Sequence, residues 1–151
     1  MDKPNGTDLE RVAMQFFAKQ GIAVSPLELG LSAKKKHCFD LGAFNPKILI
    51  ECKSHTWTCG ANIPSAKMTV WNEAMYYFHL APRDYRKVLF VLHDRRKKVG
   101  ESLLSYYRRT YAHLIPDGVE FSSGMSLPPI SFKSRISNWR AEEGRSDQGI
   151  S

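Results

Sequence analysis

Two short strands joined by a turn are expected within residues 38–53, which read Cys38-Phe39-Asp40-Leu41-Gly42-Ala43-Phe44-Asn45-Pro46-Lys47-Ile48-Leu49-Ile50-Glu51-Cys52-Lys53. Asn45-Pro46 interrupts the apolar residues and is typical of a turn, so a strand is predicted on each side of it. When the two strands pair antiparallel about this turn, Asp40 lies roughly opposite Glu51. Two carboxylates are therefore expected together at one end of the hairpin.

The second strand of this hairpin ends in Glu51-Cys52-Lys53. Side chains alternate across a strand, so Glu51 and Lys53 are predicted on one face. The other face should point into a core, and it carries Ile48, Ile50 and Cys52. An ammonium group thus joins the two carboxylates at the same strand end.

Two carboxylates beside an ammonium group are suited to chemistry on a phosphate. Magnesium typically accepts one or two carboxylates, while water and phosphate oxygens fill its other positions. A lysine next to such a cation can orient or deprotonate an attacking water and offset the charge that builds up on the phosphate. The cluster of Asp40, Glu51 and Lys53 therefore predicts a Mg²⁺ site.

Asp40 and the apolar strand that ends in Glu51-Cys52-Lys53 resemble the PD-(D/E)XK signature of restriction endonuclease-like nucleases. The resemblance implies a metal-dependent phosphodiesterase in which Asp40 and Glu51 bind the metal, with the Cys52 carbonyl as a further ligand. Lys53 would then position the water for in-line attack. Phe39 stands where the signature often has proline, a position that varies within the family.

The first helix is expected to begin at Thr7-Asp8-Leu9-Glu10, a capping-box pattern in which Thr7 and Glu10 satisfy free backbone amides. Glu10 also lies beside the apolar stripe of this helix. Two interpretations stay open: Glu10 only caps the helix, or it is a third carboxylate of the site. The second follows from the resemblance, because many family members place an acidic residue on this helix, facing the metal.

Some members of the family also carry a glutamine and a tyrosine four residues apart on the helix after the lysine strand. Asn72 and Tyr76 have this spacing in the helix expected over 65–80, but the first residue differs in type. The match is therefore partial.

The expected elements follow the order helix, strand, strand, strand, helix, strand over residues 7–93. A restriction endonuclease-like core requires this order, so the resemblance implies an α/β fold with a central mixed sheet flanked by helices. Hydrophobic periodicity and turn residues place a first helix that Gly21 ends, strands within 22–31, 38–44, 47–53 and 87–92, helices over 65–80 and 101–114, and an edge strand over 119–121.

Length and composition predict one globular domain with its own core. The chain has 151 residues, of which 42% are hydrophobic and 25% are charged. We expect a nuclease domain over residues 7–121, a disordered N-terminus over 1–6, and a basic, partly disordered extension over 122–151.

The compartment and the partner are also predicted from composition. No apolar run approaches the ~20 residues of a membrane span, and no signal-peptide segment follows the first residues, so no membrane association is expected. Three cysteines without paired spacing favour a reducing cytoplasm. The formal net charge of +7 suits a polyanionic partner.

Two runs of cations flank the expected site along the chain. Each is read either as a solvated loop or as a contact to the nucleic-acid backbone, since clustered cations bind phosphates without reading sequence. The first run consists of Lys34, Lys35 and Lys36, and the second of Arg95, Arg96, Lys97 and Lys98.

Together these features predict a magnesium-dependent DNA endonuclease of the restriction, homing or junction-resolving type. A small nuclease needs a second copy to cut both strands of a duplex. We therefore expect a homodimer or a higher homo-oligomer, with the helices over 65–80 and 101–114 as candidate interfaces. The alternative is a non-catalytic DNA-binding module on the same scaffold, which would bind DNA with strong salt dependence but would not cut it.

Overall fold

The structure is a computed structural model that describes residues 6–32, 35–58, 63–93 and 100–126. The predicted order of helix, three strands, helix and strand is confirmed. In chain order the elements are α1 (Gly6–Ala18), β1 (Ser25–Ser32), β2 (Lys35–Phe44), β3 (Lys47–Lys53), α2 (Ser65–Leu80), β4 (Arg86–His93), α3 (Leu103–Thr110), the 3-10 helix η2 (Ala112–Leu114) and β5 (Val119–Ser126). None of the described helices is both long and apolar enough to cross a membrane.

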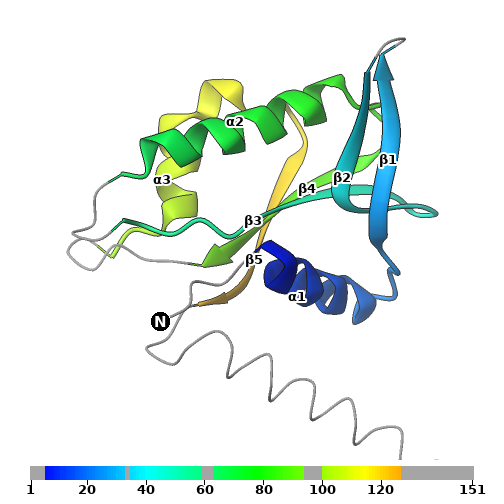
Figure 1. The fold of residues 1–151 in the computed structure, drawn as a ribbon, viewed down its shortest axis with the longest axis horizontal. Helices are drawn as coiled ribbons and strands as arrows, with labels where there is room; N and C mark the ends of the chain where they lie inside the picture. The colour runs from blue at the N-terminus through cyan, green and yellow to red at the C-terminus, as the bar shows by residue number, and fades with distance from the viewer. Residues whose placement is uncertain (1–5, 33–34, 59–62, 94–99, 127–151) are drawn as a thin grey trace, which may run out of the picture.

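The five strands form one mixed sheet in the order β1-β2-β3-β4-β5. The first three strands are antiparallel neighbours, whereas β3, β4 and β5 run parallel to one another. Helix α1 covers one face of the sheet, and α2 and α3 cover the other (Figure 1). The chain is thus an α/β fold with a mixed sheet between helices, as predicted.

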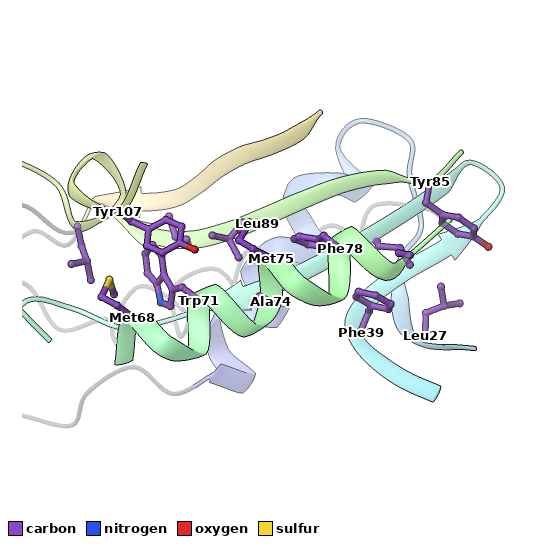
Figure 2. Packing of buried hydrophobic residues seen from close by; sticks show 14 residues of the cluster. Leu27, Phe39, Met68, Trp71, Ala74, Met75, Phe78, Tyr85, Leu89 and Tyr107 are labelled. Carbon is purple, nitrogen blue, oxygen red and sulfur yellow. The ribbon is translucent and has the colours of Figure 1, made fainter. Parts of the chain in front are cut away.

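Two hydrophobic clusters, one on each face, hold the helices to the sheet. In β3, Ile48, Ile50 and Cys52 pack toward α1, while Leu49 packs toward α2, so the predicted alternation of this strand is confirmed. Strand β4 is buried on both faces, as its continuous apolar sequence predicts. The larger cluster fills the space under α2 and α3, where Figure 2 shows Trp71 and Tyr107 side by side.

Two helix starts differ from the prediction. Helix α1 begins at Gly6, so Thr7 lies inside its first turn rather than before it. Helix α3 begins at Leu103 rather than at residue 101, because the Ser102 hydroxyl caps it by accepting a hydrogen bond from the Ser105 amide. It also stops at Thr110, and a short 3-10 turn follows.

The last strand is longer than predicted. Strand β5 runs to Ser126, beyond the domain boundary predicted at residue 121, because it pairs with β4 along nearly its whole length, ending with His93 opposite Ser126. The domain therefore includes residues assigned to the C-terminal extension. Disorder was predicted over 1–6 and over part of 122–151. Of these segments, 1–5 and 127–151 lie outside the described residues, whereas Gly6 begins α1.

A close approach at Gly124 makes β5 sensitive to a single methyl group. A Cβ at this position would lie 2.6 Å from the Phe90 ring and 3.0 Å from Val12. We expect Gly124→Ala to lower the free energy of unfolding by about 1–3 kcal/mol, measured by urea denaturation. Gly30→Ala is the control, since nothing lies within 4 Å of a Cβ there. Equal stability of the two variants would contradict this packing.

Candidate active site

Asp40 lies at a β-bulge in β2. Between Ser25 and Leu27 of β1, the partner residue in β2 moves from Gly42 to Phe39, so β2 carries one extra residue here. As a result Phe39 packs toward α2, whereas two residues later Leu41 packs toward α1. Bulges of this kind commonly redirect a side chain near a functional site.

The redirected carboxylate of Asp40 reaches the backbone of β3. Its Oδ2 accepts a hydrogen bond of 2.8 Å from the amide of Cys52. Within a strand, the N–H and C=O of one residue point to the same neighbouring strand, so the Cys52 carbonyl is also directed to the side of Asp40. The Cys52 side chain is buried on the α1 face, and burial raises the pKa of its thiol. Cys52 therefore offers its backbone carbonyl rather than a thiolate.

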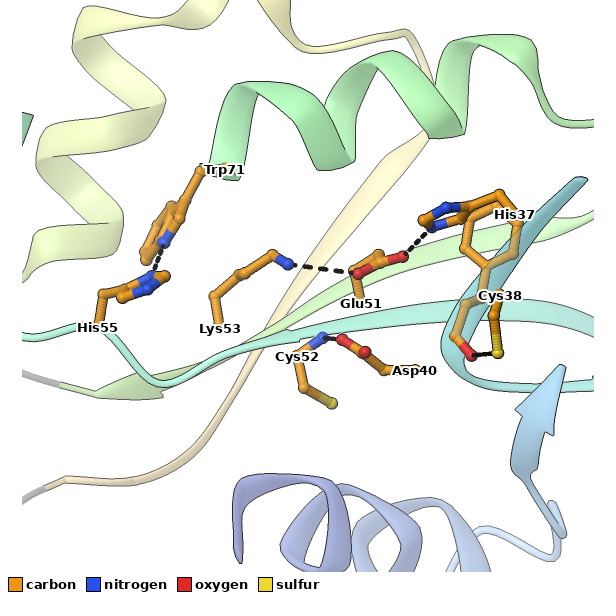
Figure 3. A network of polar contacts seen from close by, with 9 residues as sticks. His37, Cys38, Asp40, Glu51, Cys52, Lys53, His55 and Trp71 are labelled. Atoms are coloured by element: carbon orange, nitrogen blue, oxygen red, sulfur yellow. Dashed lines mark hydrogen bonds and ion pairs between the residues drawn. The ribbon is translucent and has the colours of Figure 1, made fainter. Parts of the chain in front are cut away.

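Glu51 lies next to this bulge, and two side chains contact its carboxylate oxygens (Figure 3). Its Oε1 lies 2.8 Å from Nε2 of His37, and its Oε2 lies 3.4 Å from Nζ of Lys53. The residue is only 4% exposed. The structure thus brings Asp40, Glu51 and Lys53 together, and the sequence prediction that Glu51 and Lys53 share one face is confirmed.

The electrostatics of Glu51 reflect this burial. Desolvation first, and then the negative charge of Asp40, raise the pKa of Glu51 to about 8, while Lys53 opposes the shift. The ionised form of the acid pair is therefore costly unless further positive charge is supplied.

Glu10, on α1, is influenced by the charges of this cluster. It is partly buried, and this burial, followed by the charge of Asp40, raises its pKa, while Lys53 lowers it. The charges of Asp40 and Lys53 therefore reach Glu10. Its place agrees with the prediction of a third acidic residue near the site, and whether it binds a cation stays a prediction.

The donor set fits a hard cation. Carboxylate and carbonyl oxygens are the ligands that Mg²⁺ takes from proteins, usually one or two carboxylates completed by water and phosphate oxygens. Within the described ranges, no three His, Cys, Asp or Glu side chains are grouped to hold a metal ion. The candidate site is thus an open pair of carboxylates with a backbone oxygen rather than a closed cage.

His37 is part of the site, although the sequence pattern did not predict this role. It belongs to β2, which begins at Lys35 rather than at residue 38 as predicted. The bulge at Asp40 places His37 and Phe39 on the α2 face, where the imidazole reaches Glu51. The signal in the sequence was weak, because a histidine beside a lysine run looks like part of a solvated turn.

The resemblance suggested Asn72 and Tyr76 of α2 as residues near the site, but another pair from this helix lies there. Asn72 accepts a hydrogen bond of 2.8 Å from the hydroxyl of Tyr107, and Tyr76 is 60% exposed. The residues near the site are Glu73 and Tyr77, also four apart. Tyr77 stacks on His37, and the charge of Glu73 acts on the pKa of His37, which burial chiefly lowers.

His55, just after β3, is held by the core. The buried indole of Trp71 donates a hydrogen bond of 2.8 Å from Nε1 to Nδ1 of His55. Indole only donates, so this bond requires the neutral imidazole with its proton on Nε2. Burial, followed by the charges of Lys67 and Lys53, lowers the pKa of His55. His55 is therefore suited to donate a hydrogen bond rather than to act as a base.

Removing this indole donor should change the titration of His55. A hydrogen bond to the neutral imidazole lowers its pKa, so we expect Trp71→Phe to raise the pKa of His55. NMR titration of the histidine ring protons in the parent and in the variant measures this shift. An unchanged His55 titration would contradict the assigned hydrogen bond.

The predicted nucleic-acid contacts are only partly described. Lys35 and Lys36 lie exposed at the start of β2, directly before His37, and Lys36 lies 3.9 Å from Glu28. The other predicted contacts lie outside the described residues, namely Lys34, Arg95, Arg96, Lys97 and Lys98.

Comparison with known proteins adds no relative. The chain matches no protein-family model, no curated protein and no solved structure.

Proposed function

We propose that this protein is a magnesium-dependent endodeoxyribonuclease that hydrolyses phosphodiester bonds in DNA. The observation that carries the proposal is the meeting of Asp40, Glu51 and Lys53 at the β2–β3 hairpin, with Glu51 almost fully buried. A buried carboxylate beside a second one is unfavourable in its ionised form, and a bound cation would compensate the charge.

The residues that would hold the cation are Asp40, Glu51 and the carbonyl of Cys52. When bound, Mg²⁺ would supply charge stabilisation for the phosphate oxygens and would lower the pKa of a bound water. Lys53 projects from the same face as Glu51, with its Nζ 3.4 Å from Oε2. From there its ammonium group would orient the attacking water and offset negative charge on the phosphate.

The element order supports a restriction endonuclease-like core as the finer description of this fold. Three antiparallel strands follow the first helix, and a crossover helix leads to a parallel fourth strand. The resemblance of the Asp40 to Lys53 segment falls at the junction of the second and third strands, where that core carries its acidic residues.

DNA is the proposed substrate because of charge. The chain carries a formal net charge of +7, and the exposed Lys35 and Lys36 lie on the strand that also bears His37 and Asp40. Lysines at this place would contact the phosphate backbone on the approach to the site.

We also propose a homodimer or higher homo-oligomer, so that both strands of a duplex are cut. The exposed Tyr76 of α2 and Leu114 of η2 line one groove together with His79 and His113, and this groove is a candidate interface. Light scattering should give a solution mass of at least twice the 17.2 kDa of one chain. A mass of one chain at micromolar concentration would contradict this assembly.

Incubation with supercoiled plasmid tests the activity itself. With Mg²⁺ we expect conversion to nicked and linear forms, and with EDTA we expect none. A gel shift run in parallel identifies the alternative function, since salt-sensitive binding without cleavage would indicate a DNA-binding module. Absence of both cleavage and binding would contradict the proposal and its alternative.

A further inference from the structure

The side chain of His37 is fixed from three directions. Its ring stacks on Tyr77 of α2 with a centroid distance of 3.6 Å and an interplanar angle of 12°. The ring of Phe39 meets it edge-on at 4.6 Å and 89°, and Nε2 lies 2.8 Å from Oε1 of Glu51. An imidazole held in this way can keep a bonded carboxylate in one orientation.

The two oxygens of Glu51 have different partners. His37 on β2 is hydrogen-bonded to Oε1, and Lys53 on β3 lies near Oε2 at the longer distance of 3.4 Å. Contacts from two strands thus define the plane of the carboxylate, within a residue that is 4% exposed. Without His37, the carboxylate could turn about its last bond, since that torsion is soft.

The proton on His37 follows from its partner. An ionised carboxylate only accepts hydrogen bonds, so Nε2 of His37 must carry a proton whenever Glu51 is ionised. His37 is then a donor to the carboxylate and is not itself a ligand of a cation through this nitrogen.

We propose that His37 is a positioning residue for a divalent cation: it binds Oε1 of Glu51 and so leaves Oε2, on the side of Lys53, to the cation. The inference rests on the proposed function, because it assigns the cation to Asp40 and Glu51. Partners that orient the ligands of a metal commonly change its affinity by about 10–100-fold when they are removed.

Two substitutions separate the hydrogen bond from the ring. His37→Phe keeps an aromatic ring for Tyr77 to stack on but has no donor, whereas His37→Gln keeps a donor near the place of Nε2 but has no ring. His37→Ala is a second variant without a donor. Lys19→Ala is the control, because it removes an exposed side chain just after α1, outside both the candidate site and the candidate interface.

The measurement is the affinity of the full chain for Mn²⁺, a probe for Mg²⁺, by titration calorimetry, with thermal unfolding in EDTA as a test of folding. We expect His37→Phe and His37→Ala to weaken Mn²⁺ binding about tenfold or more. His37→Gln should retain most of the affinity, and Lys19→Ala should bind like the parent. A purely structural role would instead make affinity follow thermal stability, with no rescue by glutamine.

The outcomes distinguish this inference from the proposed function. If the parent cuts plasmid and binds Mn²⁺ but the folded His37 variants bind it equally well, the inference is wrong and the nuclease proposal stands. If Mn²⁺ binding weakens as expected but the parent does not cut DNA, the inference stands and the nuclease proposal is wrong. If the parent binds no Mn²⁺, both are wrong.

Discussion

Lys53→Ala should lower the rate of magnesium-dependent DNA cleavage by about 10³-fold, within the range found when a group that handles a proton in the reaction is removed. The Nζ of Lys53 lies 3.4 Å from Glu51, and its charge acts on Glu51 and Glu10. Because the side chain acts on the attacking water, DNA binding should remain close to that of the parent.

Cleavage under single-turnover conditions, together with gel-shift affinity, measures these two effects separately. Lys19→Ala is the matched control, since it removes an exposed lysine just after α1 and should change neither quantity greatly. Asp40→Ala should also abolish cleavage, because Oδ2 of Asp40 anchors the site to the Cys52 amide. If Lys53→Ala and Asp40→Ala both cut DNA at the parent rate, the site assignment is wrong.

Glu51→Gln should abolish cleavage and yet stabilise the metal-free protein at alkaline pH. Burial and Asp40 raise the pKa of Glu51 from 4.5 to about 8, so the unfolded chain loses this proton at lower pH than the folded chain. Between these values the folded state binds more protons, and stability falls as pH rises. Glutamine does not titrate. We therefore expect the variant to be more stable than the parent near pH 8, by about 4 kcal/mol.

Urea denaturation in EDTA near pH 8 and near pH 4.5 measures this difference, which should largely vanish at the lower pH. Glu28→Gln is the control, since Glu28 is an exposed carboxylate on β1 and its removal should give no such gain. Added Mg²⁺ should stabilise the parent but not Glu51→Gln, because a ligand stabilises only the state that binds it. A Glu51→Gln protein that is less stable than the parent near pH 8 would contradict the electrostatic account.

Much of the fold could be predicted because it depends on local pattern. The alternation of Ile48, Ile50 and Cys52 against Glu51 and Lys53 is a property of any extended strand, and it fixed the faces of β3 correctly. The continuous apolar run of β4 likewise indicated a strand covered on both sides. These predictions needed no knowledge of neighbouring elements.

The parts of the site that were missed depend on tertiary structure. The bulge beside Asp40 leaves no mark in composition, yet it decides that His37 and Phe39 point to α2. The four-residue spacing that suggested Asn72 and Tyr76 does not show which side of α2 faces the site. In the structure Tyr77 stacks on His37, whereas Tyr76 is 60% exposed. Pairing between distant residues, such as Trp71 with His55, is invisible until the helix is placed.

The central claim is that the carboxylates of residues 40 and 51 share one divalent cation. Anomalous diffraction from crystals soaked with Mn²⁺ tests it most directly. We expect a single strong peak within bonding distance of one oxygen from each carboxylate and close to the Cys52 carbonyl. A peak bound elsewhere, or no peak at saturating Mn²⁺ in crystals where both side chains are ordered, would contradict the account.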